Sequence, residues 1–272
     1  MVSHKSMPVT YTFDFLGSLG NWLFIYAAGL SVRRRYGVNI RFNPFEYNTN
    51  SQQDYRTNVL AGVCKYQNGP EDRVNTSPEL LTGGQVNMFL DIPPGNQDRH
   101  LRDYFQNALY FTEYPEIADE FRAALQSYRD TLVQKYPDLA TSAFLHLRKG
   151  DYLQYGWWIG PEYYKRALAK YSPDQHFYVL GQFSGDTHDE LLTGVNYTPV
   201  EAGDEVEGLA LMTLCGRGGI TCNSTYSWWG GFLNDQPERL IVSPIQWLVA
   251  QFNNPAADWL AENDSKQPWI LV

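Results

Sequence analysis

The sequence predicts an α/β protein with parallel sheets in two lobes, and three observations lead to this prediction. The chain opens with a strand, a glycine loop and a helix, over Val9–Tyr36. Its second half alternates short apolar runs with helical runs, the pattern of a doubly wound parallel sheet. Between them, the stretch Thr141–Tyr152, TSAFLHLRKGDY, changes abruptly from apolar residues to charged ones. This change from apolar to charged residues is typical of a buried parallel strand whose carboxyl end places polar groups in a crevice.

Composition limits the functions that the chain can have. With 272 residues, it could form one large domain or two of about 130 residues each. Its net charge of −9 argues against general binding to a phosphate backbone, so we expect no nucleic-acid partner and only a local anion site. Aromatic residues make up 15% of the chain, which suits sugar-binding surfaces but equally a large core.

Cysteine use and hydropathy favour a cytoplasmic protein. The three cysteines, Cys64, Cys215 and Cys222, form no CxxC pair and no metal-ligand spacing with histidine, so a reduced compartment is the simpler interpretation. The first ten residues contain no apolar core of signal-peptide length. No later stretch approaches the length of a membrane-spanning helix, and we expect no transmembrane segment.

The first half of the chain is predicted to hold two strands and two helices. The strands are Val9–Phe15 and Val38–Phe42, and the helices are Asn21–Tyr36 and Ile117–Lys135. Asn21 follows the glycine loop and is a natural helix N-cap, which would direct backbone N–H groups toward a bound anion. Pro137 and Asp138 break the second helix, so we predict a domain boundary near residue 138, with lobes at 1–138 and 139–272.

The second half alternates strands and helices in regular order. Strands are predicted at Ser142–Leu147, His176–Leu180, Gly219–Cys222 and Arg239–Val242. Helices are predicted at Pro161–Lys170, Asp186–Leu192, Glu205–Leu214 and Ser227–Leu233. This alternation predicts a parallel sheet with a helix on each crossover.

The polar end of the central strand is the first candidate site. His146 and Arg148 lie two residues apart and therefore point to the same side of a strand. Gly150 lets the backbone turn, and Asp151 adds a carboxylate beside the cations. An imidazole and a guanidinium directed together suit a nucleotide diphosphate. The alternative is that these residues form only a solvated turn at the end of a strand.

Four segments together resemble the α-1,2-fucosyltransferase family, glycosyltransferase family 11. They are Gly17–Ala28, Tyr104–Phe111, the HLRKGDY stretch and Asn223–Leu233. The resemblance spans nearly the whole chain and implies two Rossmann-like lobes facing across a cleft, the GT-B architecture. It also implies inverting transfer of L-fucose from GDP-fucose to a hydroxyl of a glycan acceptor, the 2-OH of galactose or a similar sugar. The lobe at 1–138 would then serve the acceptor, and the lobe at 139–272 would bind the nucleotide sugar.

Such a transfer needs a positive partner for the charge that develops on the leaving diphosphate. Many glycosyltransferases use a metal held by a D-x-D pair, but this sequence has no such pair, so we expect no metal or other cofactor. Arg148 is the candidate partner, because a guanidinium binds phosphate in a fork and keeps its proton. The resemblance places His146 on the guanine side. Lys149 stands where the family usually has a second arginine, so it keeps the positive charge but cannot bind phosphate in a fork. The alternative is that Lys149 is a surface lysine that points away from the site.

A second donor segment is the run Asn223-Ser224-Thr225, which follows a predicted strand and opens a helix. Hydroxyls and free N–H groups at a helix start form an anion site, so we assign all three residues to donor binding. The alternative is simple capping of the helix, which would need only one of the three.

Several residues are candidates for acceptor binding and activation. Asp151 could accept the hydroxyl proton or could orient Arg148 by a salt bridge. Asp14, at the end of the first strand, is a second candidate. The resemblance assigns Asn21 to the fucosyl or phosphate group. Trp22 replaces the glutamine that is usual in the family, and it could stack on an acceptor sugar or merely pack against the glycine loop.

One departure from the family leaves the donor open. Relatives commonly have an acidic pair after the strand where this chain reads Leu180-Gly181-Gln182-Phe183. Asp186, Glu201 or Glu205 could substitute for that pair. Two alternative functions therefore remain, a glycosyltransferase with another nucleotide-sugar donor and a non-catalytic protein that binds a nucleotide sugar or a glycan.

Overall fold

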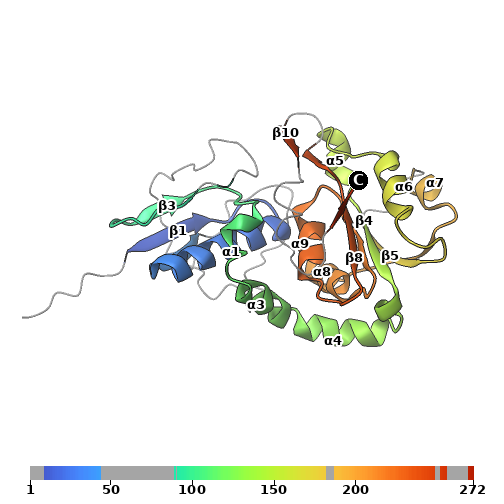
Figure 1. Cartoon of the computed structure of the whole chain (residues 1–272), viewed down its shortest axis with the longest axis horizontal. Helices are drawn as coiled ribbons and strands as arrows, with labels where there is room; N and C mark the ends of the chain where they lie inside the picture. Colours follow the sequence, from blue (N-terminus) through green and yellow to red (C-terminus); the bar gives the residue numbers. More distant parts are fainter. Residues whose placement is uncertain (1–8, 44–88, 90, 182–186, 249–251, 256–268) are drawn as a thin grey trace, which may run out of the picture. The chain divides into compact units, whose positions relative to one another are not determined.

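The computed structural model describes residues 9–43, 89, 91–181, 187–248, 252–255 and 269–272. The chain divides into two compact units, Met1–Glu120 and Phe121–Val272. Each unit has its own parallel sheet (Figure 1), which confirms the predicted α/β class with parallel sheets. The domain boundary near residue 138 remains a prediction. Gln182, where relatives commonly have an acidic pair, and Asp186, one candidate to replace that pair, lie outside the described residues.

The first unit contains a three-stranded parallel sheet of order β2-β1-β3, with α1 on one face. Its elements are β1 (Thr10–Asp14), α1 (Leu19–Tyr36), β2 (Asn39–Asn43), β3 (Arg99–Leu101), the 3₁₀ helix η2 (Ala108–Tyr110) and the start of α3 (Glu116–Ala124). Gly29 allows α1 to approach the sheet closely, because a Cβ there would lie 2.6 Å from the ring of Phe42 and 3.4 Å from that of Phe13.

Helix α1 begins at Leu19 rather than at Asn21, and its N-cap is Ser18. Gly17 adopts a positive φ of 69°, a conformation that favours glycine, and Ser18 is then extended. The backbone N–H groups of Asn21 and Trp22 both donate to the carbonyl oxygen of Ser18, at 2.9 and 3.1 Å. The N-cap prediction for Asn21 is therefore wrong, because the glycine turn starts the helix earlier and leaves Asn21 within its first turn.

The second unit is built around a six-stranded sheet in which all paired strands are parallel. Its strands are β4 (Ala143–Leu147), β5 (His176–Gly181), β6 (Asn196–Pro199), β7 (Gly218–Ile220), β8 (Leu240–Ser243) and β11 (Ile270–Leu271). Its helices are α4 (Gln126–Lys135), α5 (Gly150–Gln154), α6 (Pro161–Leu168), α7 (Thr187–Leu192), α8 (Glu205–Leu214) and α9 (Thr225–Leu233), with a 3₁₀ turn η3 (Leu139–Thr141) before β4. A separate antiparallel pair joins β9 (Gln246–Leu248) and β10 (Phe252–Pro255).

The strand order β11-β8-β7-β4-β5-β6 contains one reversal of direction. From β4 the chain adds β5 and β6 on one side, and it then crosses over to add β7, β8 and β11 on the other. Side chains of α6 and α7 pack with one face of the sheet, whereas α8 and α9 pack together on the opposite side (Figure 1). In sheets of this kind, ligands bind outside the carboxyl ends of the strands at the reversal, which here lies between β4 and β7.

The predicted elements of the second half are present, and the structure adds some that the pattern did not reveal. Strand β6 reads Asn-Tyr-Thr-Pro, which lacks an apolar run and ends in proline, and β11 has two residues. Helix α5 occupies residues expected to turn. The helix predicted at Ile117–Lys135 is two helices, α3 and α4, which meet at the buried Leu125.

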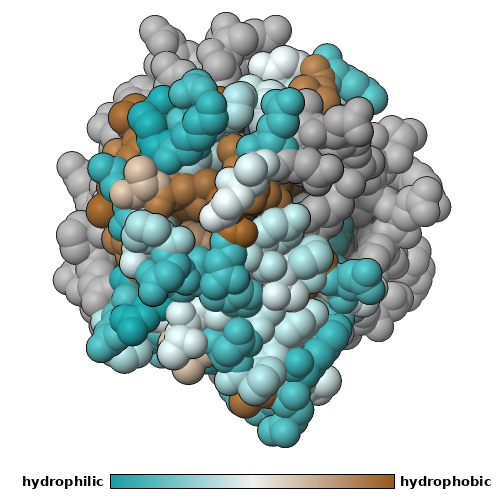
Figure 2. Space-filling model, turned by 90° about the vertical axis from the view of Figure 1, so that its right-hand side faces the viewer, coloured by the Kyte–Doolittle hydropathy of each residue, from teal (hydrophilic) through white to brown (hydrophobic). Residues whose placement is uncertain are grey.

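The surface of the described residues is largely polar. Figure 2 shows hydrophilic residues over much of the coloured surface, with one larger group of apolar residues and a few apolar residues elsewhere. Large apolar side chains exposed in the second unit are Val133, Leu153, Tyr155 and Ile245. Among the described helices, none combines the length and the apolar character needed to cross a membrane.

Candidate functional site

The candidate site lies at the carboxyl ends of β4 and β7, where the strand order of the second unit reverses. β4 ends at Leu147, and β7 ends at Ile220. Because these strands are parallel neighbours, the segments that follow them emerge at the same edge of the sheet. The structure thereby gathers at this edge the predicted residues His146, Arg148, Lys149, Asp151, Asn223, Ser224 and Thr225.

The guanidinium of Arg148 is held in a fork by the carboxylate of Asp151. Nε donates to Oδ1 and Nη2 donates to Oδ2, each over 3.1 Å. Burial alone would lower the pKa of Arg148, but the hydrogen bonds and the charge of Asp151 outweigh it and raise that pKa above its ordinary value. Both side chains remain partly exposed. The contact matches the orienting role that was one of the two alternatives for Asp151.

His146 is buried beneath this edge and uncharged. Its Nδ1 lies 3.2 Å from Sγ of Cys222, and its ring meets Tyr226 edge to face at 5.4 Å. Burial, followed by the charge of Arg148, lowers the pKa of His146 from 6.5 to about 3. Burial raises the pKa of the Cys222 thiol to about 12, so this group stays protonated and can donate to Nδ1. His146 therefore provides hydrogen bonds at this edge, and its contact with guanine stays a prediction.

A set of three residues ties the two loops of the site together, and we call it the clasp. The hydroxyl of Tyr152 donates to the carbonyl oxygen of Asn223 at 3.1 Å. The side-chain amide of Asn223 donates to the carbonyl oxygen of Trp157 at 2.8 Å. The ring of Tyr152 also lies beneath Arg148, with Cζ 5.1 Å from the ring centre. Burial raises the pKa of Tyr152, so its hydroxyl remains a donor at neutral pH.

The amide oxygen of Asn223 is a buried acceptor with no hydrogen-bond partner among the described residues. Leaving a buried polar atom unpaired is costly, and such an atom suits a donor group of a ligand.

Ser224 is the N-cap of α9, yet its side chain makes no capping hydrogen bond. The alternative that this segment serves only to cap the helix therefore finds no support in the side chain of Ser224. Nearby, the ammonium of Lys149 lies 5.8 Å from the ring centre of Trp158, and its phosphate contact stays a prediction.

Two predicted residues of the first unit, Asn21 and Trp22, lie in the first turn of helix α1. Oδ1 of Asn21 accepts a hydrogen bond from Nε2 of Gln106 at 2.8 Å. Trp22 is only 2% exposed, and its ring stacks on Phe15 with centres 4.2 Å apart. The structure thus shows the packing role that was one of the two alternatives for Trp22, and contact with a sugar remains a prediction.

Asp14 lies at the end of β1 and belongs to a buried polar group. Its Oδ1 is 2.6 Å from Nε2 of His100 and accepts a hydrogen bond from Nδ2 of Asn43 at 2.8 Å. Arg102 approaches the other oxygen, with Nη1 3.9 Å from Oδ2. Asn43 is the last residue of β2 and His100 is the central residue of β3, so the group draws on all three strands.

Sequence reasoning assigned no role to Tyr152, Cys222 or His100. Tyr152 closes the HLRKGDY stretch, so its position in the motif was the available signal. Cys222 and His100 gave no local signal, because each meets its partner through the alignment of neighbouring strands.

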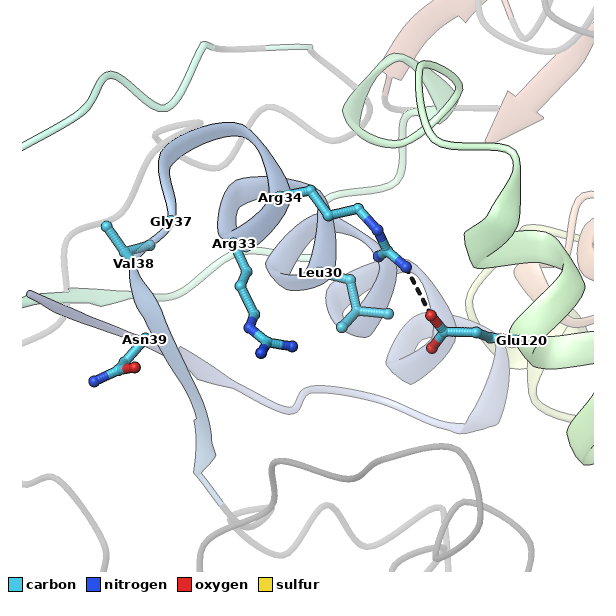
Figure 3. A pocket seen from close by; sticks show the side chains of 7 residues that line it. All are labelled: Leu30, Arg33, Arg34, Gly37, Val38, Asn39 and Glu120. Carbon is cyan, nitrogen blue, oxygen red and sulfur yellow. Dashed lines mark hydrogen bonds and ion pairs between the residues drawn. The ribbon is translucent and has the colours of Figure 1, made fainter. Parts of the chain in front are cut away.

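Within the described ranges, no group of three or more His, Cys, Asp or Glu side chains is arranged to hold a metal ion. A cavity of about 460 Å³ opens in the first unit at the end of α1 and the start of β2 (Figure 3). The residues that line it are Leu30, Arg33, Arg34, Gly37, Val38, Asn39 and Glu120, with an ion pair of 2.6 Å between Arg34 and Glu120. It adjoins the amino end of β2, away from the carboxyl edge where α/β sheets bind ligands.

Comparisons with known proteins give one partial match in sequence. The chain matches no protein-family model. It is 30% identical over 122 residues to the O-antigen biosynthesis glycosyltransferase WbnK of Escherichia coli, and the match covers 40% of this chain and 40% of that protein. Over this segment the chain is similar to a glycosyltransferase.

Solved structures with similar folds are more distant. The fucosyltransferase NodZ from Bradyrhizobium is 12% identical, with 84% of this chain and 94% of that chain covered and a TM-score of 0.47. A variant of FUT1 from Arabidopsis thaliana in complex with GDP is 10% identical, with 88% and 71% covered and a TM-score of 0.43. A glycosyltransferase of family 9 from Veillonella parvula is 11% identical, with 97% and 86% covered and a TM-score of 0.43.

Proposed function

We propose that this chain is an inverting glycosyltransferase that transfers L-fucose from GDP-fucose to a hydroxyl of a glycan, the 2-OH of galactose or a similar sugar. The observation that carries the proposal is a partly exposed arginine, Arg148, held by Asp151 where the strand order of a parallel sheet reverses. A guanidinium at this edge suits a diphosphate, because it pairs with phosphate oxygens in a fork. The partial similarity to an O-antigen glycosyltransferase supports a sugar acceptor.

Arg148 would stabilise the leaving group. As the bond between the anomeric carbon and the phosphate oxygen breaks, negative charge grows on the diphosphate, and a fixed positive charge nearby lowers the barrier. The raised pKa of Arg148 keeps the guanidinium charged. Asp151 would act by orienting it, because both carboxylate oxygens already accept hydrogen bonds from Arg148. In this scheme no metal is required.

The rest of the donor would meet uncharged polar groups at the same edge. Ser224 and Thr225, at the start of α9, would contact phosphate oxygens through hydroxyl and backbone N–H groups. The buried amide oxygen of Asn223 would accept a hydrogen bond from a donor hydroxyl or N–H group. His146, neutral at physiological pH, would add a directional hydrogen bond. The clasp would keep these groups in place before the donor binds.

The test combines nucleotide binding with sugar transfer. Titration calorimetry with GDP, UDP and ADP identifies the base of the donor, and binding of GDP in preference to the others is expected. Incubation with labelled GDP-fucose and lactose, whose galactose has a free 2-OH, should then give a fucosylated product. Preference for UDP or ADP would indicate another nucleotide-sugar donor. Binding of GDP without transfer to lactose or to other β-galactosides would instead indicate a non-catalytic binding protein.

A further inference from the structure

An aromatic surface lies on helix α5 and the loop that follows it, in the second unit. Tyr155, the C-cap residue of α5, is 50% exposed, and among the described side chains of this unit no other aromatic residue is exposed to that extent. Its ring lies beside that of the partly buried Trp157, with centres 4.9 Å apart and planes inclined by 32°. These two residues, which we call the aromatic pair, present flat apolar surface to the solvent.

The backbone around the aromatic pair is fixed by hydrogen bonds. Gly156 adopts a positive φ of 68°, which favours glycine and turns the chain back toward α5. The backbone N–H groups of Trp157 and Trp158 then both donate to the carbonyl oxygen of Tyr152, at 2.8 and 3.2 Å. The side-chain amide of Asn223 donates to the carbonyl oxygen of Trp157 at 2.8 Å. A ligand that binds here therefore needs to order little of the chain, which lowers the cost of binding.

The aromatic pair adjoins the edge at which the diphosphate would bind. The ring of Tyr152 meets that of Trp157 edge to face, with centres 5.6 Å apart. The guanidinium of Arg148 lies over the same tyrosine ring, at 5.1 Å from its centre. One side chain, that of Tyr152, therefore connects Arg148 to the aromatic pair. In a glycosyl transfer the acceptor hydroxyl attacks the carbon that is bonded to the diphosphate, so the acceptor sugar must also lie beside this edge.

Packing explains the neighbouring Trp158 but not Tyr155. Trp158 stacks on Tyr164 with ring centres 5.4 Å apart, and it packs against the apolar core of the second unit. The ammonium of Lys149 approaches the same indole ring, at 5.8 Å from its centre. Half of the surface of Tyr155, in contrast, stays in contact with water. Exposed apolar surface next to a binding edge is typical of a ligand contact.

A sugar that extends into solvent fits this surface best. Galactose carries its axial hydroxyl on one face, whereas C–H groups gather on the opposite face and can lie flat on an aromatic ring. Removing these C–H groups and the ring from water is favourable. The donor sugar has to be shielded from water to avoid hydrolysis, and a half-exposed tyrosine does not shield it. The acceptor glycan, which continues beyond the reacting galactose, is not limited in this way.

We infer that the aromatic pair, Tyr155 and Trp157, binds the acceptor glycan by stacking on the C–H face of its galactose, an inference that rests on the proposed glycosyl transfer. The resemblance to the fucosyltransferase family implied acceptor binding by residues 1–138. The aromatic pair adds an acceptor contact from the second unit, on the same loop that the clasp ties to the diphosphate edge. Its substrate class is a glycan that ends in galactose.

The test measures initial rates with GDP-fucose as donor and lactose as acceptor. Tyr155→Ala should raise the KM for lactose about three- to tenfold, the effect of losing one aromatic contact, and should change kcat little. Tyr155→Phe keeps the ring and should keep that KM within about twofold of wild type. Val133→Ala, which removes an apolar side chain of similar exposure from α4, is the control and should leave the KM unchanged.

Three further readouts separate acceptor binding from folding and from donor binding. Thermal melting reports on folding, and the dissociation constant for GDP should be the same in all these proteins. Saturation-transfer NMR on lactose in the presence of GDP should show the strongest signal on the C–H protons of the galactose face, and a weaker signal with Tyr155→Ala. Trp157→Ala should raise the KM for lactose about tenfold. If that variant does not fold, the Tyr155 variants decide the question.

Two results would overturn the inference while leaving the proposed function intact. One is a folded Tyr155→Ala variant with the wild-type KM for lactose. The other is a Tyr155→Ala variant that binds GDP more weakly at an unchanged KM for lactose, which would place the nucleotide base on the aromatic pair. A wild type that transfers fucose to no β-galactoside would instead overturn the proposed function, and the inference with it.

Discussion

Replacing Tyr152 by phenylalanine removes one hydroxyl from the clasp and leaves the ring in place beneath Arg148. The hydroxyl donates to the carbonyl oxygen of Asn223, a residue that is 2% exposed. Losing this bond while the acceptor stays buried should cost about 1–2 kcal/mol of unfolding free energy. In a unit of this size that lowers the melting temperature by about 2–8 °C. If the loosened loops leave only about a third to a tenth of molecules with an ordered edge, the GDP dissociation constant rises about three- to tenfold.

Tyr163→Phe is a matched control for this change. Its hydroxyl also donates to a buried carbonyl oxygen of the second unit, that of Thr221 at 2.6 Å, but it does not join the two loops of the site. Both variants should therefore lose similar stability in thermal melts, whereas calorimetry with GDP should show weaker binding for Tyr152→Phe alone. GDP affinity equal to wild type in both variants would refute the reasoning that the clasp orders the site.

Four other changes test individual residues and the leaving-group chemistry. If Asp151 only orients Arg148, Asp151→Asn should keep kcat within about tenfold of wild type. Initial rates reduced on the order of 100-fold would instead indicate that Asp151 is the base that accepts the hydroxyl proton. Folding lowers the pKa of His146 from 6.5 to about 3, so between these values the unfolded chain binds a proton that the folded chain does not. As the pH falls from 7 to 5, His146 should therefore lower the free energy of unfolding by about 2 kcal/mol. Denaturant melts of His146→Gln should lack that loss. Trp22→Gln, which breaks the stack on Phe15, should lower the melting temperature and leave GDP binding unchanged. Transfer activity should survive a chelator, and activity restored only by added magnesium or manganese would show that a metal serves the leaving group.

Elements with strong local patterns could be predicted from the sequence. The pattern predicts helix α8 at Glu205–Leu214, its observed range, and its N-cap Asp204 accepts hydrogen bonds from the backbone N–H groups of Val206 and Glu207. The mainly apolar run Ser142–Leu147 predicts strand β4, and all five residues of that strand are buried. The start of α1 could not be located in this way, because it depends on the positive φ of Gly17, which a sequence pattern does not specify.

The candidate site could be predicted only in part, for a related reason. The cations and carboxylate of the HLRKGDY stretch are neighbours in sequence, so their meeting was foreseeable. The role of Asp151 could not be predicted, because it depends on the two hydrogen bonds from Arg148, which only the side-chain geometry reveals. His100 lies in a strand of three residues, and its meeting with Asp14 follows from the register of β1 and β3. Contacts that depend on register have no local signature.

Titration of GDP into the wild type and into Arg148→Ala tests most directly the claim that the edge formed by β4 and β7 binds the diphosphate. Arg166→Ala, which removes an exposed arginine of α6, is the control for the loss of one positive charge. We expect Arg148→Ala to weaken GDP binding on the order of 10- to 100-fold, the effect of losing a charged hydrogen-bonding partner. The control should bind as the wild type does. Equal GDP affinity in all three proteins would contradict the account.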